Sequence, residues 1–308
     1  MCTPAAPDFI RYLAAKKALD DRSLNWQVWD HLVEALRDRP ESSPLRVLEV
    51  GCGIGTMVER LLDQGLLTRA AYTGIDVEPG CIRAAVQRLH GYAAGRQVPL
   101  TVDAAGSMLF TSPTQEVRIT FAAADLFDFL GREAGEAAWD LLVAHAVLDL
   151  INLAAGLPRL LSRLAPGGLF YFSLNFDGAT IFEPSIDPDL DALIEALYHG
   201  SMDTRRSRGR PSGSSRTGRR LFGSLKEAGA RLIAAGSSDW VVFPGPDGYP
   251  GDEAFFLHFI IDTIGRALHG HPELAGSGFP AWIAQRHLQI EARELIYIAH
   301  QLDFLGYI

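Results

Sequence analysis

Residues 47–57 read VLEVGCGIGTM. An apolar run of β-forming residues, Val47–Val50, precedes three glycines spaced two apart, and Thr56 then opens an apolar pattern of helical spacing. Glycine permits positive φ and a close approach of the backbone to a ligand, and the first turn of the following helix has free N–H groups. The stretch therefore predicts a strand, a turn that binds a nucleotide-type ligand, and a helix.

Strand and helix patterns alternate along the next part of the chain, with helices expected at Thr56–Gln64 and Pro79–Leu89 and a helix end at Arg159–Leu164. The expected strands are Arg46–Val50, Ala71–Ile75, Val117–Ala123, Trp139–His145 and Leu169–Asn175. Strands that alternate with helices of this length predict an α/β fold, a doubly wound parallel sheet with helices on both faces.

The flanking regions are predicted to be helical additions to this sheet. Residues 8–38 indicate two helices with a break near Asp21 or Ser23, so residues 1–44 are expected to be an N-terminal helical lid on a catalytic domain of residues 45–308. Residues 92–115 are expected to be an irregular insertion, residues 176–220 a substrate-covering helical insertion, and residues 250–292 a helical excursion. Further helices are expected at 187–199, 221–228, 252–268 and 279–292, with a β run ending in SDWVVF and a last strand in ELIYIAHQLDFLGYI.

Composition argues against several classes of protein. The chain of 308 residues has a formal net charge of −9, which repels polyanions, so no nucleic-acid partner is expected. Its three cysteines have no zinc-site spacing, so no metal is expected and a reduced, cytoplasmic protein is the simpler interpretation. The N-terminus lacks the apolar core of a signal peptide, and the stretch DLLVAHAVLDLINLAAGL is too short and polar to cross a membrane.

The spacing of the turn distinguishes between nucleotides. A dinucleotide fingerprint, G-x-G-x-x-G, requires glycine where this chain has Thr56. The sequence instead has E-x-G-x-G-x-G from Glu49 to Gly55. A carboxylate beside a pyrophosphate is repelled, whereas it suits a ligand with a positive charge. A nicotinamide-dependent dehydrogenase is therefore disfavoured.

Two later strand ends carry aspartates. Asp76 ends the second strand, where a carboxylate can accept hydrogen bonds from both ribose hydroxyls, and Asp125 ends the third, where it can accept from an adenine amino group. Each aspartate can instead cap the helix that follows it. Together with Glu49, the set favours an adenosine ligand with a cationic end.

Five segments, LRVLEVGCGIGTM, YTGIDVEPG, AAADLFDFL, WDLLVAHAVLDL and LAPGGLFYFSLN, resemble in order and spacing the class I S-adenosylmethionine-dependent methyltransferases over residues 45–175. The resemblance implies a Rossmann-like sheet of seven strands, the sixth at SDWVVF and the last antiparallel, and S-adenosyl-L-methionine as cofactor, with S-adenosyl-L-homocysteine as product. It also implies that the glycine turn with Glu49 holds the methionine moiety, Asp76 the ribose and Asp125 the adenine.

The predicted cofactor-binding residues are Glu49, Gly51, Cys52, Gly53, Gly55, Thr56, Asp76, Val77, Asp125, Leu126, His145 and Arg22. His145 ends the fourth strand near the methyl group and is the candidate catalytic base, although a histidine that merely satisfies a strand end fits equally well. Methyl transfer needs a base only when the acceptor must lose a proton early. Arg22 is a candidate partner of the ligand carboxylate or, alternatively, part of a surface salt bridge.

A small organic substrate is expected to lie in an enclosed, partly aromatic pocket formed by the N-terminal helices and residues 176–292. The candidate lining residues are Tyr12, Phe176, Phe182, Tyr198, His199, Met202 and His287. The stretch from Arg205 to Arg220 holds seven arginines; it is either a mobile loop over the site or a solvated loop.

The leading functional hypothesis is methylation of a small organic molecule by in-line displacement. Methylation of a protein or peptide side chain, and a cofactor-binding regulatory protein without activity, are the alternatives. The acceptor atom and the oligomeric state stay open.

Overall fold

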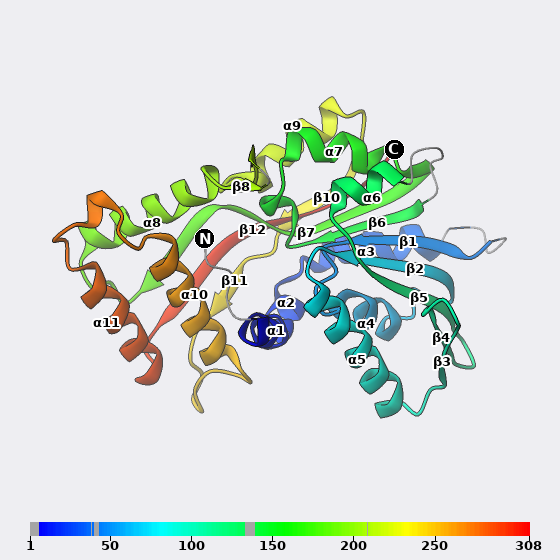
Figure 1. The fold of residues 1–308 in the computed structure, drawn as a ribbon, viewed down its shortest axis with the longest axis horizontal. Coiled ribbons are helices and arrows are strands. Elements are labelled where there is room, and N and C mark those ends of the chain that lie inside the picture. The colour runs from blue at the N-terminus through cyan, green and yellow to red at the C-terminus, as the bar shows by residue number, and fades with distance from the viewer. Residues whose placement is uncertain (1–5, 38, 40–42, 133–138, 208) are drawn as a thin grey trace.

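A computed structural model describes residues 6–37, 39, 43–132, 139–207 and 209–308. Its centre is one ten-stranded sheet (Figure 1). The strands of this sheet are β1 (Leu45–Val50), β2 (Arg69–Asp76), β3 (Leu100–Val102), β4 (Met108–Thr111), β5 (Glu116–Ala123), β6 (Trp139–His145), β7 (Leu164–Glu183), β10 (Arg231–Ser237), β11 (Trp240–Val242) and β12 (Ile296–Tyr307). The helices are α1 (Ala6–Ala15), α2 (Lys17–Ser23), α3 (Trp26–Arg37), α4 (Thr56–Asp63), α5 (Pro79–Gly95), α6 (Leu126–Arg132), α7 (Leu153–Leu161), α8 (Pro188–Asp203), α9 (Thr217–Glu227), α10 (Glu253–Ala267) and α11 (Phe279–Glu291).

The strand order confirms the predicted fold class. The sheet runs β10-β12-β7-β6-β1-β2-β5-β4-β3, and β11 also pairs with β12. The strands from β5 to β7 in this order are parallel, whereas β12 is antiparallel to both β7 and β10. Seven strands from β10 to β5 thus form the doubly wound sheet with an antiparallel last strand, and β3, β4 and β11 are additions.

Residues of β1 point alternately to two apolar layers, one on each face of the sheet. Val47 packs into the layer that holds the N-terminal helices, α4 and α5, while Leu48 packs into the layer that holds α7 and α9. Both side chains are fully buried. This burial on both faces explains why the strand reads as a continuous apolar run rather than an alternating one.

The strand pair β7–β12 extends beyond the rest of the sheet (Figure 1) and carries α8, α10 and α11 at that end. The prediction that the fifth strand ends at Asn175 is therefore wrong, because β7 continues to Glu183. Buried Thr180 and Phe182 flank exposed Ile181 in the two-residue period of a strand. The helical insertion begins only after this extension.

Other boundaries also differ from the predictions. Residues 8–38 hold three helices rather than two, since a break at Lys16 precedes the expected break at Ser23. The expected irregular insertion at 92–115 contains the end of α5 and the β3–β4 hairpin, which extends the sheet edge. The place of the sixth strand belongs to β10, and SDWVVF instead contributes β11, which pairs with the first half of β12.

The arginine-rich stretch is partly regular. It contains the short strands β8 (Arg206–Ser207) and β9 (Arg210–Pro211), which pair with each other, and the start of α9. Arg208, like Cys2, lies outside the described residues. Within the described part of the chain, no helix is long and apolar enough to cross a membrane.

Candidate active site

The turn after β1 has the backbone geometry that its glycines predict. Gly51, Gly53 and Gly55 have φ values of +66°, +53° and +77°, all in the left-handed region that favours glycine. A Cβ atom at Gly51 would lie 2.6 Å from Cγ2 of Val147, which follows β6. The turn therefore needs glycine both for its φ angles and for its close approach to the end of β6.

Asp76 joins the end of β2 to this turn. Its Oδ2 accepts a hydrogen bond from Gly53 N at 2.9 Å and its Oδ1 accepts one from Glu78 N at 2.9 Å. Burial raises the pKa of Asp76, and the two N–H groups oppose that shift. The side chain is half-buried, and Val77 beside it is 61% exposed, so an apolar surface adjoins the carboxylate.

Glu49 lies beneath the turn and is buried among side chains of the sheet. The Tyr72 hydroxyl donates a hydrogen bond to its carboxyl group. Burial raises the pKa of Glu49 to about 8, against the influence of Arg60. The Arg60 guanidinium pairs with Asp21 of α2, with Nε 2.8 Å from Oδ1. Burial therefore favours the protonated form of Glu49 at this position.

Asp125 sits at the start of α6, as the capping alternative predicts. Its Oδ1 accepts hydrogen bonds from Phe127 N at 2.9 Å and Asp128 N at 3.2 Å. Ala124 N donates to the Asp76 backbone oxygen at 2.9 Å, so the ends of β5 and β2 lie side by side. Leu126 is half-buried against the core. The proposed contacts of Asp125 and Leu126 with adenine stay predictions.

His145 ends β6 with both ring nitrogens engaged. Nδ1 lies 2.8 Å from Ser173 Oγ, and Nε2 lies 3.3 Å from Asp20 Oδ2. Burial lowers the pKa of His145 to about 4, against the influence of Asp20. The neutral ring must donate from Nε2 to the carboxylate, so Nδ1 accepts from the Ser173 hydroxyl. Neither nitrogen is free to take a proton from an acceptor in this arrangement.

Asp20 connects the N-terminal helices to the sheet. Its Oδ2 also pairs with Lys16 Nζ at 2.8 Å, and its Oδ1 accepts from Trp240 Nε1 at 3.0 Å. Burial alone would raise the pKa of Asp20, but Lys16 and His145 lower it well below its usual value. Lys16 and Asp20 were not predicted to be site residues. Their i,i+4 spacing was the available signal, and it does not reveal burial.

Helix α1 packs over the glycine turn after β1. A Cβ atom at Gly53 would lie 3.5 Å from Leu13 Cδ1, and one at Gly80 would lie 3.9 Å from Ile10 Cδ1. In Figure 1, α1 and α2 lie beside α4 and α5 at this end of the sheet. Helix α1 therefore contacts the glycine turn, and the role of residues 1–44 as a lid stays a prediction.

Several predicted substrate residues pack against other aromatic rings. Tyr12 of α1 stacks on Phe259, with ring centroids 4.2 Å apart, and Phe176 lies with its ring 5.4 Å from that of His199. Burial raises the pKa of both Tyr12 and Tyr198, and the negative charge of Asp149 adds to the rise in each phenol. Met202 follows Tyr198 on α8.

Three predicted residues have other partners. Arg22 pairs with Glu253, with Nη2 2.9 Å from Oε2, which is the salt-bridge alternative. Phe182 packs on Trp282 near the far end of β7, at a centroid distance of 5.8 Å. His287 lies on α11, with Nδ1 2.7 Å from His258 Nδ1, and in Figure 1 this helix is far from α4. Their roles toward cofactor or substrate stay predictions.

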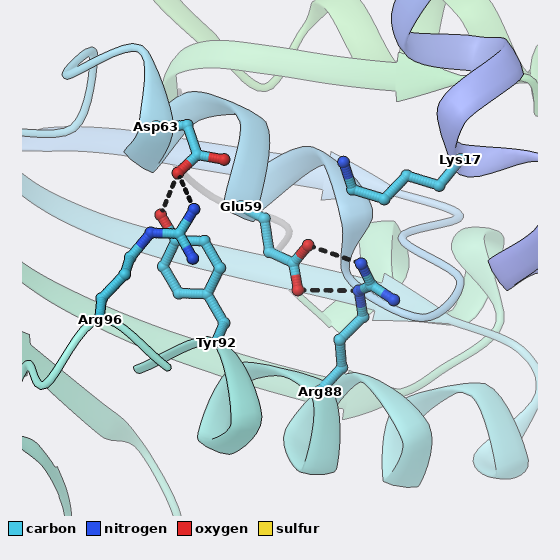
Figure 2. Close-up of a pocket in the computed structure, with 6 residues that line it drawn as sticks. All are labelled: Lys17, Glu59, Asp63, Arg88, Tyr92 and Arg96. Carbon is cyan, nitrogen blue, oxygen red and sulfur yellow. Dashed lines mark hydrogen bonds and ion pairs between the residues drawn. The ribbon is translucent and has the colours of Figure 1, made fainter. Parts of the chain in front are cut away.

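A surface groove of about 450 Å³ lies between α2, α4 and α5, and Figure 2 shows its lining. The groove is lined by Lys17, Glu59, Asp63, Arg88, Tyr92 and Arg96. The charges of these side chains are mostly paired with one another. Arg88 forms an ion pair with Glu59 at 2.8 Å, and Arg96 forms one with Asp63 at 2.5 Å (Figure 2). None of the predicted site residues lines it, so this groove is not the predicted active site. No group of side chains in the described residues is arranged to hold a metal ion.

Comparisons with known proteins agree with this geometry. The family described as "Methyltransferase domain" matches residues 48–170. Trans-aconitate 2-methyltransferase of Methylobacterium nodulans is 33% identical over 130 residues, which cover 42% of this chain and 38% of that protein. Ubiquinone biosynthesis O-methyltransferase of Xylella fastidiosa is 38% identical over 81 residues, which cover 26% of this chain and 30% of that protein. The chain thus spans less than half the length of these curated relatives.

Among solved structures, an S-adenosylmethionine-dependent methyltransferase from Thiobacillus denitrificans, in complex with S-adenosyl-L-homocysteine, is 15% identical. The alignment covers 92% of each chain with a TM-score of 0.45. Phosphoethanolamine N-methyltransferase 2 of Haemonchus contortus is 13% identical, with a TM-score of 0.41 and a coverage of 91% of this chain and 52% of that one.

Proposed function

Because residues 48–170 are a methyltransferase domain of the class I superfamily, we propose that the protein transfers a methyl group from S-adenosyl-L-methionine to a small organic molecule. One observation carries the proposal. The three glycines with positive φ lie in one turn after β1, and Gly53 N donates a hydrogen bond to the half-buried Asp76 at the end of β2, inside the matched region. That is the edge of a doubly wound sheet where ligands bind.

The residues present fit this cofactor. Helix α4 begins at Thr56, and its N-cap residue Gly55 provides no side-chain cap, so the backbone N–H groups of its first turn can receive the carboxylate of a methionine moiety. Asp76 retains acceptor capacity for ribose hydroxyls, since each carboxylate oxygen can accept two hydrogen bonds. Exposed Val77 provides an apolar surface for the base. When bound, the cofactor would supply a methyl group attached to a sulfonium sulfur. The sulfur departs as the neutral thioether of S-adenosyl-L-homocysteine.

The chain's own contribution to the reaction is alignment and exclusion of water. Leu13 of α1 and Val147, which follows β6, both lie against the glycine turn. A reacting pair held about 3–3.5 Å apart in such an enclosure needs little further chemical assistance. His145 positions the strand end through Ser173 and Asp20 rather than acting as a base in this arrangement.

A small substrate is favoured over a protein side chain because the site is covered. Helix α1 lies on the glycine turn, and aromatic side chains of α1 and α10 stack directly against each other at Tyr12 and Phe259. A protein substrate would need an open groove at this position. We therefore also propose that residues 1–44 are the lid of the catalytic domain and that residues 176–220 help to cover the substrate.

Isothermal titration calorimetry with S-adenosyl-L-homocysteine tests the cofactor part directly. We expect saturable binding and a rise of the melting temperature, because a ligand at about 100 times its Kd stabilises the folded state by about 2.7 kcal/mol. NAD is the matched negative ligand. Absence of binding by S-adenosyl-L-homocysteine, or equal binding of NAD, would contradict the proposal.

A further inference from the structure

Asp149 is half-buried, and one of its carboxylate oxygens has no hydrogen-bond partner among the described residues. It lies in the 3₁₀ turn that follows β6, four residues after His145. Its Oδ1 is inaccessible to solvent and has no hydrogen-bond partner among the described residues. A buried acceptor without a donor destabilises the fold unless a ligand supplies the donor. The position is therefore a candidate for contact with the acceptor substrate.

A cation without an ion pair lies close to Asp149. Arg205 follows α8 and is half-buried, and it is not ion-paired to any residue in the described part of the chain. A Cβ atom at Gly213 would lie 2.8 Å from the Asp149 backbone oxygen and 3.5 Å from Arg205 Nη1. The guanidinium therefore borders the same turn as the carboxylate, although the two charges do not form an ion pair.

Lys16, Tyr12 and Tyr198 are further titratable groups whose charges interact with that of Asp149. Lys16 is the second cation in reach of Asp149, but Asp20 neutralises it at 2.8 Å. The phenols of Tyr12 and Tyr198 complete the titratable groups that face the carboxylate. Burial raises the pKa of Asp149, against the influence of its own backbone N–H, of Arg205 and of Lys16.

We propose that Asp149 and Arg205 bind the two ends of a dipolar acceptor substrate, Asp149 an amino or ammonium group and Arg205 a carboxylate. The inference rests on the proposed methyl transfer and specifies its substrate class. An ammonium supplies the donor that Asp149 lacks, and a carboxylate can accept two hydrogen bonds from one guanidinium. The nearby rings of Tyr12 and Phe259 suit the apolar body of such a molecule.

The first experiment compares four sets of small molecules of matched size. These are α-amino acids, the amines left by removing their carboxylate, the acids left by removing their amino group, and neutral amides of those acids. Formation of S-adenosyl-L-homocysteine is measured for each. We expect kcat/KM for an amino acid to exceed that of its matched amine and acid by about 10-fold or more, the loss expected for one charged hydrogen bond. Equal use of any other set, or no turnover in all four, overturns the inference.

The second experiment tests separately the residues proposed for the two ends of the substrate. Asp149→Asn should lower kcat/KM about 10- to 100-fold for the best amino acid and leave the matched acid unchanged. Arg205→Gln should lower it similarly for the amino acid and leave the matched amine unchanged. Arg206→Gln, a change at an exposed neighbouring arginine, is the control and should have no effect. This substrate-selective pattern is not expected from a merely structural role.

Binding of S-adenosyl-L-homocysteine distinguishes the two levels of proposal. All three variants should bind it with unchanged Kd, because neither charge is assigned to the cofactor. Weakened binding in Asp149→Asn or Arg205→Gln, or equal losses on all substrates, would overturn the substrate assignment while the methyltransferase proposal stands. Failure of the unmodified protein to bind S-adenosyl-L-homocysteine would remove the methyltransferase proposal itself.

Discussion

The backbone N–H of Gly53 donates a hydrogen bond to the Asp76 carboxylate over 2.9 Å, and this contact joins two strand ends that are 23 residues apart in sequence. The same carboxylate also accepts from Glu78 N at the start of α5. One side chain therefore fixes the glycine turn, the end of β2 and the following helix, and it remains half-exposed for a ligand.

Asp76→Asn should weaken the binding of S-adenosyl-L-homocysteine. The amide keeps one acceptor oxygen for Gly53 or a ribose hydroxyl but loses the charge and the second acceptor. A charged hydrogen bond contributes about 1.5–3 kcal/mol, so we expect Kd to rise about 10- to 100-fold by calorimetry. Asp63→Asn, on the exposed end of α4, is the matched control and should bind normally. Unchanged affinity in Asp76→Asn would remove the ribose assignment.

Gly51→Ala should destabilise the fold more than Gly65→Ala does. Both glycines have nearly the same positive φ, +66° and +67°. A Cβ atom at Gly65 would have no neighbour within 4 Å, whereas one at Gly51 would lie 2.6 Å from Val147. The left-handed conformation costs both alanines about 1–2 kcal/mol, and overpacking adds about 1–3 kcal/mol at Gly51 alone.

Urea denaturation of the two variants measures this difference. A larger loss of unfolding free energy in Gly51→Ala is expected, and Gly51→Ala should also impair cofactor binding because the turn must shift. Equal losses in the two variants would mean that Val147 moves away from the added methyl group without a cost in unfolding free energy.

The sheet was predictable from sequence because its signals are local. Each of the segments VLEV and WDLLVAH is a mainly apolar run that ends beside a turn, so the strands and their order could be recognised. The extension of β7 was not recognised, since Gly178 interrupts the apolar pattern before Thr180 and Phe182 resume it.

The partners of site residues could not be predicted in the same way. His145 contacts Asp20 across a sequence separation of 125 residues, and no local pattern marks that contact. No local pattern marks Asp149 as a substrate-binding candidate, because Tyr198 and Arg205, whose charges interact with it, come from a distant segment. Periodicity identifies elements, while the contacts between them depend on how the whole chain packs.

Glu49→Gln should remove a pH dependence of stability. The pKa of Glu49 is raised by burial to about 8 in the folded protein, from 4.5. A raised folded-state pKa means that the stabilisation is fully present below pH 4.5 and is lost as the pH rises through 8. Glutamine is neutral throughout, so the variant should lose less stability between pH 5 and about 8.5.

Denaturant unfolding at several pH values, compared with Glu34→Gln at an exposed position, measures this effect. Glu34→Gln should reproduce the slope of the unmodified protein. If the slope of Glu49→Gln matched them both, Glu49 would have to be ionised beneath the turn.

Asp20→Asn should strongly destabilise the contact between the N-terminal helices and the sheet. The substitution removes the charge that neutralises Lys16, whose side chain is 9% exposed, and weakens the acceptor of His145 Nε2. Removal of one partner of a buried ion pair costs about 3–5 kcal/mol, because the remaining charge stays buried. Asparagine can still accept from Trp240, so the loss of stability reports on the charge.

Adding Lys16→Met should recover part of the stability, since the double variant contains no unpaired charge. The melting temperatures of the single and double variants decide the matter, with Lys17→Met as the control for a half-buried i,i+4 pair. A double variant no more stable than Asp20→Asn would mean that Asp20 acts through His145 and Trp240 rather than through Lys16.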